Sequence, residues 1–235
     1  MPRCQNTFRY LAPVAAAGGV YVCAHCDSGE IYRAVSEPDL LAFAGFALRT
    51  AAADFGEPAD HRTPFLIWRG VRPECVYEPA DRRYDLYLAA DPDPWQARLQ
   101  IGHEMFHRVA GGARVFHWTH EMLACLFSVR LLRLCGFAEY AARTEAYFAE
   151  EGGALTQARF VGADPCASHD TAYYGRAFLT GRALQGAAGY AALCRLARTI
   201  SPAGQPDVNG WLASLGGAER IAAALVLQST EGTQL

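Results

Sequence analysis

The feature that most constrains the fold is the run His103-Glu104-Met105-Phe106-His107, in which two histidines are four residues apart. Residues at this spacing lie on one face of an α-helix, so both imidazoles can face a single metal ion only if the segment is helical. Glu104 is next to that face, within reach of a metal-bound water. The HExxH pattern therefore predicts a helix that carries a metal site, with Glu104 as its general base.

The composition describes a globular chain and excludes several chemistries. Of the 235 residues, 51% are hydrophobic and 19% are charged, which suits one domain or two closely packed lobes. The net charge of -3 gives no basis for binding nucleic acid or an anionic membrane. All 21 basic residues are arginine, so a Schiff-base lysine and a P-loop lysine are both excluded.

Two observations favour a reduced, cytoplasmic protein. No apolar run reaches the roughly 18 to 20 residues that span a bilayer, and the apolar stretch 11–24 is interrupted by Pro13 and Gly18-Gly19, unlike a secretory signal. Most of the eight cysteines are isolated within apolar segments, as expected for buried thiols rather than disulfides.

The pattern of apolar residues predicts an α+β fold, with a sheet-bearing N-terminal subdomain over 1–110 and a helical C-terminal subdomain over 111–235. Short runs rich in β-branched and aromatic residues predict strands at 8–14, 20–24, 31–35, 65–68, 75–77 and 84–89. Apolar residues at helical spacing predict helices at 40–48, 95–109, 119–134, 138–150 and 171–184, followed by shorter helices. The expected N-caps are Ser36 or Asp39, the segment Asp91-Pro92-Asp93-Pro94, and Thr119, and the expected breaks include Gly186, Pro202, Pro206 and Gly216-Gly217.

A catalytic zinc site needs a third protein ligand and an open position for water. His117, His120 and Glu121 follow the HExxH helix and are the candidates. The break at 110–113 lets the chain turn, so the first turn of the next helix can face back toward the metal. Glu121 is placed to do so, whereas His120 points about 100° away around the helix.

The residues around this site resemble those of gluzincin metallopeptidases. Glu121-Met-Leu-Ala124, followed by Phe127 and 131–132, is similar to the ExxA helix of the small phage-repressor-cleaving type, over roughly 95–134. The resemblance implies a zincin-like α+β fold with a small mixed or antiparallel sheet, and it makes Glu121 the third zinc ligand. The residue after the Ala, usually Asp or Asn in that family, is Cys125 here. A metzincin is excluded because Ala occupies 110 and 113.

A second resemblance lies at 169–178, which is similar to the Y-x-x-G helix of aminopeptidase-like gluzincins. There a tyrosine donates a hydrogen bond to the oxyanion, and Tyr174 is the position that aligns. His169 is the alternative donor. Packing is the other role open to this aromatic pair.

Together these residues predict a zinc metallopeptidase that acts on a peptide or protein. Glu104 takes a proton from a zinc-activated water and passes it to the leaving amine, while Tyr174 or His169 binds the oxyanion. The resemblance to zincins implies that the strand at 84–88 is the sheet edge that pairs with substrate; an ordinary sheet strand is the alternative, because the sequence does not specify which strand is the edge. Binding of metal or peptide without turnover, hydrolysis of a non-peptide amide, and a helical interaction protein with accidental histidines remain the alternatives.

Cys23-Ala-His-Cys26 is half of a possible structural zinc site. Cys4 and Cys75 are the residues that could complete it, since the chain has no second CxxC.

Overall fold

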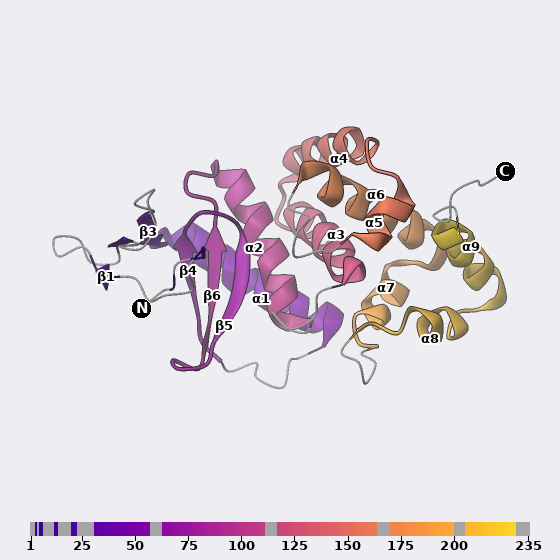
Figure 1. The fold of residues 1–235 in the computed structure, drawn as a ribbon, viewed down its shortest axis with the longest axis horizontal. Helices are drawn as coiled ribbons and strands as arrows, with labels where there is room; N and C mark the ends of the chain where they lie inside the picture. Colours follow the sequence, from indigo (N-terminus) through magenta and orange to yellow (C-terminus); the bar gives the residue numbers. More distant parts are fainter. Residues whose placement is uncertain are drawn as a thin grey trace.

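A computed structural model of the chain describes residues 3, 5–6, 12–13, 20–22, 31–56, 63–110, 117–163, 170–199 and 205–228. Within these residues the fold is mixed α and β, with the strands in the N-terminal half and most helices in the C-terminal half (Figure 1). The strands are β1 (Ala12–Pro13), β2 (Val20–Val22), β3 (Ile31–Ala34), β4 (Phe65–Arg69), β5 (Glu74–Glu78) and β6 (Arg83–Leu88). The helices are α1 (Pro38–Phe55), α2 (Pro94–Val109), α3 (Trp118–Leu134), α4 (Ala138–Gly152), α5 (Gln157–Gly162), α6 (Thr171–Ala188), α7 (Tyr190–Leu196), α8 (Val208–Ala213) and α9 (Gly217–Gln228).

The described strands form one sheet in the order β1-β2-β3-β4-β6-β5. β4 and β6 run parallel, and every other neighbouring pair is antiparallel. The edge role that the resemblance implies for the strand at 84–88 is wrong, and the alternative of an ordinary sheet strand holds: β6 pairs with β4 on one side and β5 on the other. β5 is the edge strand instead, because the chain reverses after β5 and inserts β6 between β5 and β4.

α2 joins the sheet to the helical half. It packs against β5 and β6, against α1, and against α3, which in turn packs against α4 and α6 (Figure 1). The buried apolar side chains form one continuous cluster from Val35, beside the sheet, to Ala223 on α9. The expected boundary near residue 110 therefore falls between two helices that share a core.

The helices expected over 95–109, 119–134, 138–150 and 171–184 are confirmed within a few residues. α2 begins as predicted, because the Asp93 carboxylate accepts hydrogen bonds from the amides of Trp95 and Gln96, and Pro94 occupies the first turn. This capped start at Pro94 fixes the helix phase nine residues ahead of His103.

Three predicted helix ends are wrong. The N-cap of α3 is His117, whose ring accepts a hydrogen bond from the Thr119 amide, so Thr119 lies inside the helix. The N-cap of α1 is Glu37, rather than Ser36 or Asp39, and the Glu37 side chain makes no capping hydrogen bond. α6 continues through Gly186, because one glycine lowers helix stability without preventing it, and ends where Gly189 has φ of 80°.

None of the helices in the described part of the chain is both long and apolar enough to cross a membrane.

Candidate metal centre

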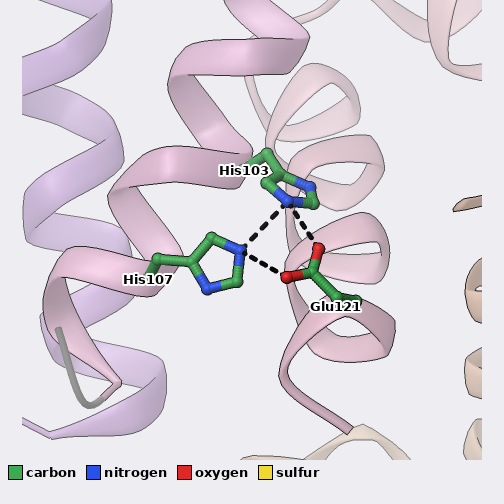
Figure 2. A group of neighbouring side chains, drawn as sticks. All are labelled: His103, His107 and Glu121. Atoms are coloured by element: carbon green, nitrogen blue, oxygen red, sulfur yellow. Dashed lines mark hydrogen bonds and ion pairs between the residues drawn. The ribbon is translucent and has the colours of Figure 1, made fainter. Parts of the chain in front are cut away.

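α2 and α3 bring together three side chains that can each donate a lone pair to a metal. His103 and His107 come from α2, and Glu121 comes from the first turn of α3 (Figure 2). The Nε2 atoms of the two histidines are 3.0 Å apart. The Glu121 carboxylate lies 3.1 Å from His103 Nε2 and 3.4 Å from His107 Nε2. These are the residues that the sequence nominated, and they form the one metal-capable group of three found among the described residues.

The donor set fits a divalent metal ion. Two imidazole nitrogens that face each other at hydrogen-bond distance need a shared proton or a metal cation between them, and the adjacent carboxylate stabilises positive charge of either kind. Two nitrogens and one oxygen match the His₂Glu set of catalytic zinc sites, which leaves a fourth position open. All three side chains are partly buried, so the site is neither closed off from solvent nor fully hydrated.

A close approach between α2 and α3 makes this geometry possible. At Gly102, next to His103, an added Cβ would lie 3.1 Å from Ser128 Cα. Because glycine has no Cβ, the two helices can approach closely at this point. This proximity is what lets a residue on α3 reach imidazoles on α2.

The charge of Glu121 suits a metal ligand. Burial raises the pKa of this carboxyl, but the imidazoles of His107 and His103 outweigh burial and hold the pKa well below its usual range. Glu121 is therefore a carboxylate with four possible lone-pair positions, two of which face the histidines.

Glu104 has a pKa that is shifted in the opposite direction to that of Glu121. Its side chain is buried and lines the cavity beside His103. Burial is the main cause that raises the pKa of Glu104 to about 8, the nearby Glu121 adds to it, and His107 opposes it. A carboxyl whose two protonation states are close in free energy near neutral pH is suited to accept and return a proton.

Tyr174, in the first turn of α6, lies beside His103, one of the three metal-capable residues. Its ring is 5.7 Å from the His103 ring, edge to face, and it lines the same cavity as Glu104. Burial, followed by the charges of Glu121 and Glu104, raises the pKa of its hydroxyl well above the usual value. The hydroxyl therefore stays protonated and can donate a hydrogen bond. His169, the other predicted donor, lies outside the described residues.

The two alternative histidine ligands are engaged elsewhere. His120 is buried, its Nε2 lies 3.0 Å from the carbonyl oxygen of Ala110, and burial lowers its pKa to about 4. His117 caps α3, with Nδ1 2.7 Å from Thr119 Oγ1. Neither belongs to the metal-capable group.

Cys125 occupies the position beside the other ring nitrogen of His103. Its Sγ is 4.0 Å from His103 Nδ1, and burial raises the pKa of the thiol well above its usual value. A neutral thiol is a weak hydrogen-bond partner, so it orients the imidazole less firmly than a carboxylate would.

A cavity of about 610 Å³ lies beside the three metal-capable residues and reaches His103. His103, Glu104 and Tyr174, which the sequence motifs predict as site residues, line this cavity, and α4, which no motif indicates, forms one of its walls. The signal for this wall is the spacing of Tyr140, Thr144 and Tyr147, which puts them on one helix face.

The proposed second zinc site stays a prediction. Cys75 is a buried thiol on β5, whereas Cys4, Cys23 and Cys26 lie outside the described residues.

Comparisons with protein-family models, curated proteins and solved structures give no match to this chain.

Proposed function

We propose that this chain is a zincin-like, zinc-dependent metallopeptidase that hydrolyses peptide bonds. The observation that carries the proposal is the convergence of His103, His107 and Glu121 beside a cavity that His103, Glu104 and Tyr174 line. An accidental HExxH has no reason to meet a carboxylate from another helix at 3.1 and 3.4 Å.

Each residue has a distinct part in this reaction. A bound zinc ion would polarise the substrate carbonyl and lower the pKa of a bound water toward ~7. Glu104 accepts a proton from the attacking water and returns it to the departing amine. The Tyr174 hydroxyl donates a hydrogen bond to the carbonyl oxygen as negative charge develops there.

The sheet supports a peptide as the substrate. β5 is its edge, and Arg72 and Pro73, immediately before β5, line the cavity. An extended peptide that pairs with the edge of β5 gains main-chain hydrogen bonds without a need for particular side chains. The strand that we assign to this role is thus β5 rather than β6. The free thiols of Cys75, Cys125, Cys135 and Cys194 favour a reducing, cytoplasmic compartment as part of the same proposal.

The test has two stages, and the first concerns the metal. Zinc is measured by elemental analysis after dialysis of wild type, His103→Asn and Glu121→Gln. We expect one tightly held zinc per wild-type chain and much less in both variants. His117→Asn is the matched control, because it removes an imidazole outside the cluster while Asn can still cap α3. Zinc content that is below one per chain and unaffected by His103→Asn would overturn the metal site.

The second stage concerns turnover. A proteome-wide cleavage profile compares wild type with Glu104→Gln, which keeps the shape of the side chain but cannot accept a proton. We expect Glu104→Gln to bind zinc and to lose cleavage by a factor of at least roughly 10². Equal activity of the two proteins on every cleaved peptide would rule out Glu104 as the base.

A further inference from the structure

One wall of the cavity is the face of α2 that carries His103. Trp95, Leu99 and His103 are spaced four residues apart, so they lie on one face of α2, and all three line the cavity. Leu99 is about 6 Å and Trp95 about 12 Å from His103 along the helix axis. An extended peptide advances roughly 3.3 Å per residue, so Leu99 is level with a residue close to the bond that would be cleaved.

The facing wall is α4. Tyr140, Thr144, Tyr147 and Phe148 share one side of this helix and line the same cavity. The Tyr140 ring stacks on Trp95 with centroids 3.9 Å apart, which joins the two walls at the end away from the metal. Tyr147 is 46% exposed, which leaves part of its ring available to a ligand.

Several polar side chains in the lining already have partners within the protein. This reduces their capacity to select a substrate, because a new bond would only replace an existing one. The hydrogen bonds run from the Trp95 amide to Asp93, from the Ala89 amide to Gln100, from Ser128 to the Cys125 carbonyl, and from Thr171 to Glu151. Between α2 and α4, Gln96, Arg143 and Thr144 are polar, and the other lining side chains, Trp95, Leu99, Tyr140, Tyr147 and Phe148, offer aromatic and aliphatic surface.

We propose that Trp95, Leu99, Tyr140, Tyr147 and Phe148 form an apolar subsite that binds a large aromatic or aliphatic side chain of the substrate, close to the cleaved bond. This inference rests on the proposed peptidase function for the identity of its ligand as a peptide. It follows from two walls of apolar side chains that lead directly to His103.

The binding test uses the zinc-loaded Glu104→Gln protein, so that peptides remain intact. The probes are capped pentapeptides of sequence Gly-Gly-Xaa-Gly-Gly in which Xaa is Phe, Leu, Ala or Asp. Binding is followed by calorimetry and by the change in tryptophan fluorescence, with Trp95→Phe as the control because Trp95 is one of four tryptophans and lines the subsite. We expect the Phe and Leu peptides to bind at least about tenfold more tightly than the Ala peptide, because their side chains leave water.

Variants of Tyr147 test the subsite itself. Tyr147→Ala should reduce the preference for Phe over Ala to less than about threefold, whereas Tyr147→Phe should keep it. Ile221→Ala is the control, since Ile221 is 62% exposed on α9 and does not line the cavity. Equal binding of the Phe and Ala peptides, or tightest binding of Asp through Arg143, would overturn the proposal.

Cleavage by the wild-type protein separates this proposal from the proposed function. Sites with a large apolar residue at a fixed position, a bias lost in Tyr147→Ala, support both. A retained binding preference without any cleavage refutes the peptidase and leaves the subsite standing. Cleavage without side-chain preference, unchanged by Tyr147→Ala, refutes the subsite alone.

Discussion

The imidazole of His103 has two different neighbours, one for each ring nitrogen. Nε2 faces Glu121 and His107, whereas Nδ1 faces the thiol of Cys125 at 4.0 Å. In metal sites the nitrogen that does not bind the metal usually donates to a carboxylate or carbonyl, which fixes the ring and raises its basicity. The thiol supplies only a weak version of this interaction.

We therefore expect Cys125→Ala to weaken zinc binding by less than about tenfold. Loss of a strong brace typically costs 10- to 100-fold in metal affinity, and a thiol is a poorer acceptor than a carboxylate. Competition with a zinc chelator measures the effect, and thermal unfolding of the apoprotein shows whether the variant remains folded. A loss of 100-fold or more would mean that Cys125 orients His103 as firmly as a carboxylate does.

His117 stabilises the start of α3 only while its ring is neutral and can accept a hydrogen bond. His117→Ala should lower the free energy of unfolding by ~1 kcal/mol, and His117→Asn should restore most of it. Burial lowers the pKa of His117, so its contribution is present above the unfolded pKa of about 6.5 and is lost as the pH falls below it.

Urea unfolding at pH 7.5 and pH 5.5 measures this effect. The wild type should lose more stability than His117→Asn between the two pH values, because Asn has no proton to gain. Equal losses in both proteins would contradict the role of the neutral ring.

At the level of the elements, the position of Tyr174 depends on the contact between α4 and α6. A Cβ added at Gly175 would lie 2.5 Å from Gly152 N and 2.6 Å from the Phe148 carbonyl oxygen. The two helices therefore touch through their backbones, one residue from Tyr174. The same contact holds α4, which carries Tyr147, against the helix that carries the proposed hydrogen-bond donor.

Gly175→Ala should lower the free energy of unfolding by roughly 1 to 3 kcal/mol, because the new methyl group forces the helices apart. It should also lower kcat by displacing the Tyr174 hydroxyl. Gly186→Ala on the same helix is the control: an added Cβ there has no neighbour within 4 Å, so it should raise stability by ~0.5 to 1 kcal/mol. Chemical unfolding and peptide cleavage of both variants check this, and similar values for the two would contradict the close contact.

At the level of the whole molecule, the three metal-capable residues come from both halves of the chain. His103 and His107 belong to 1–110 and Glu121 belongs to 111–235, while the buried apolar cluster is continuous across both. A metal ion held by this group therefore stabilises the contact between the halves as well as the site.

Zinc should accordingly stabilise the complete fold. At a free zinc concentration 100 times the Kd, the expected gain is ~2.7 kcal/mol in the free energy of unfolding. Thermal unfolding with zinc and with excess chelator measures the gain, and Glu121→Gln should reduce it strongly. A zinc-dependent shift of the same size in Glu121→Gln would show that the ion binds elsewhere.

The sequence by itself determined the local parts of this protein. It located α2 and α3 and put His103 and His107 on one helix face, because helix period and capping act over a few neighbouring residues. It also nominated Glu121 over His117 and His120, because the first turn of the next helix directs Glu121 back toward α2 and the resemblance to gluzincins implies the same ligand. It misplaced the start of α3 because a histidine side chain, rather than Thr119, supplies the cap.

Only the tertiary structure decided which strand is the edge and what encloses the cavity. The alternation of residues in β5 and β6 is compatible with either order, and pairing between strands settles it. The α4 wall depends likewise on contacts between segments far apart in the sequence, including the backbone contact of Gly152 with Gly175. Spacing within one helix specifies which donors share a face, whereas packing between helices specifies what that face meets.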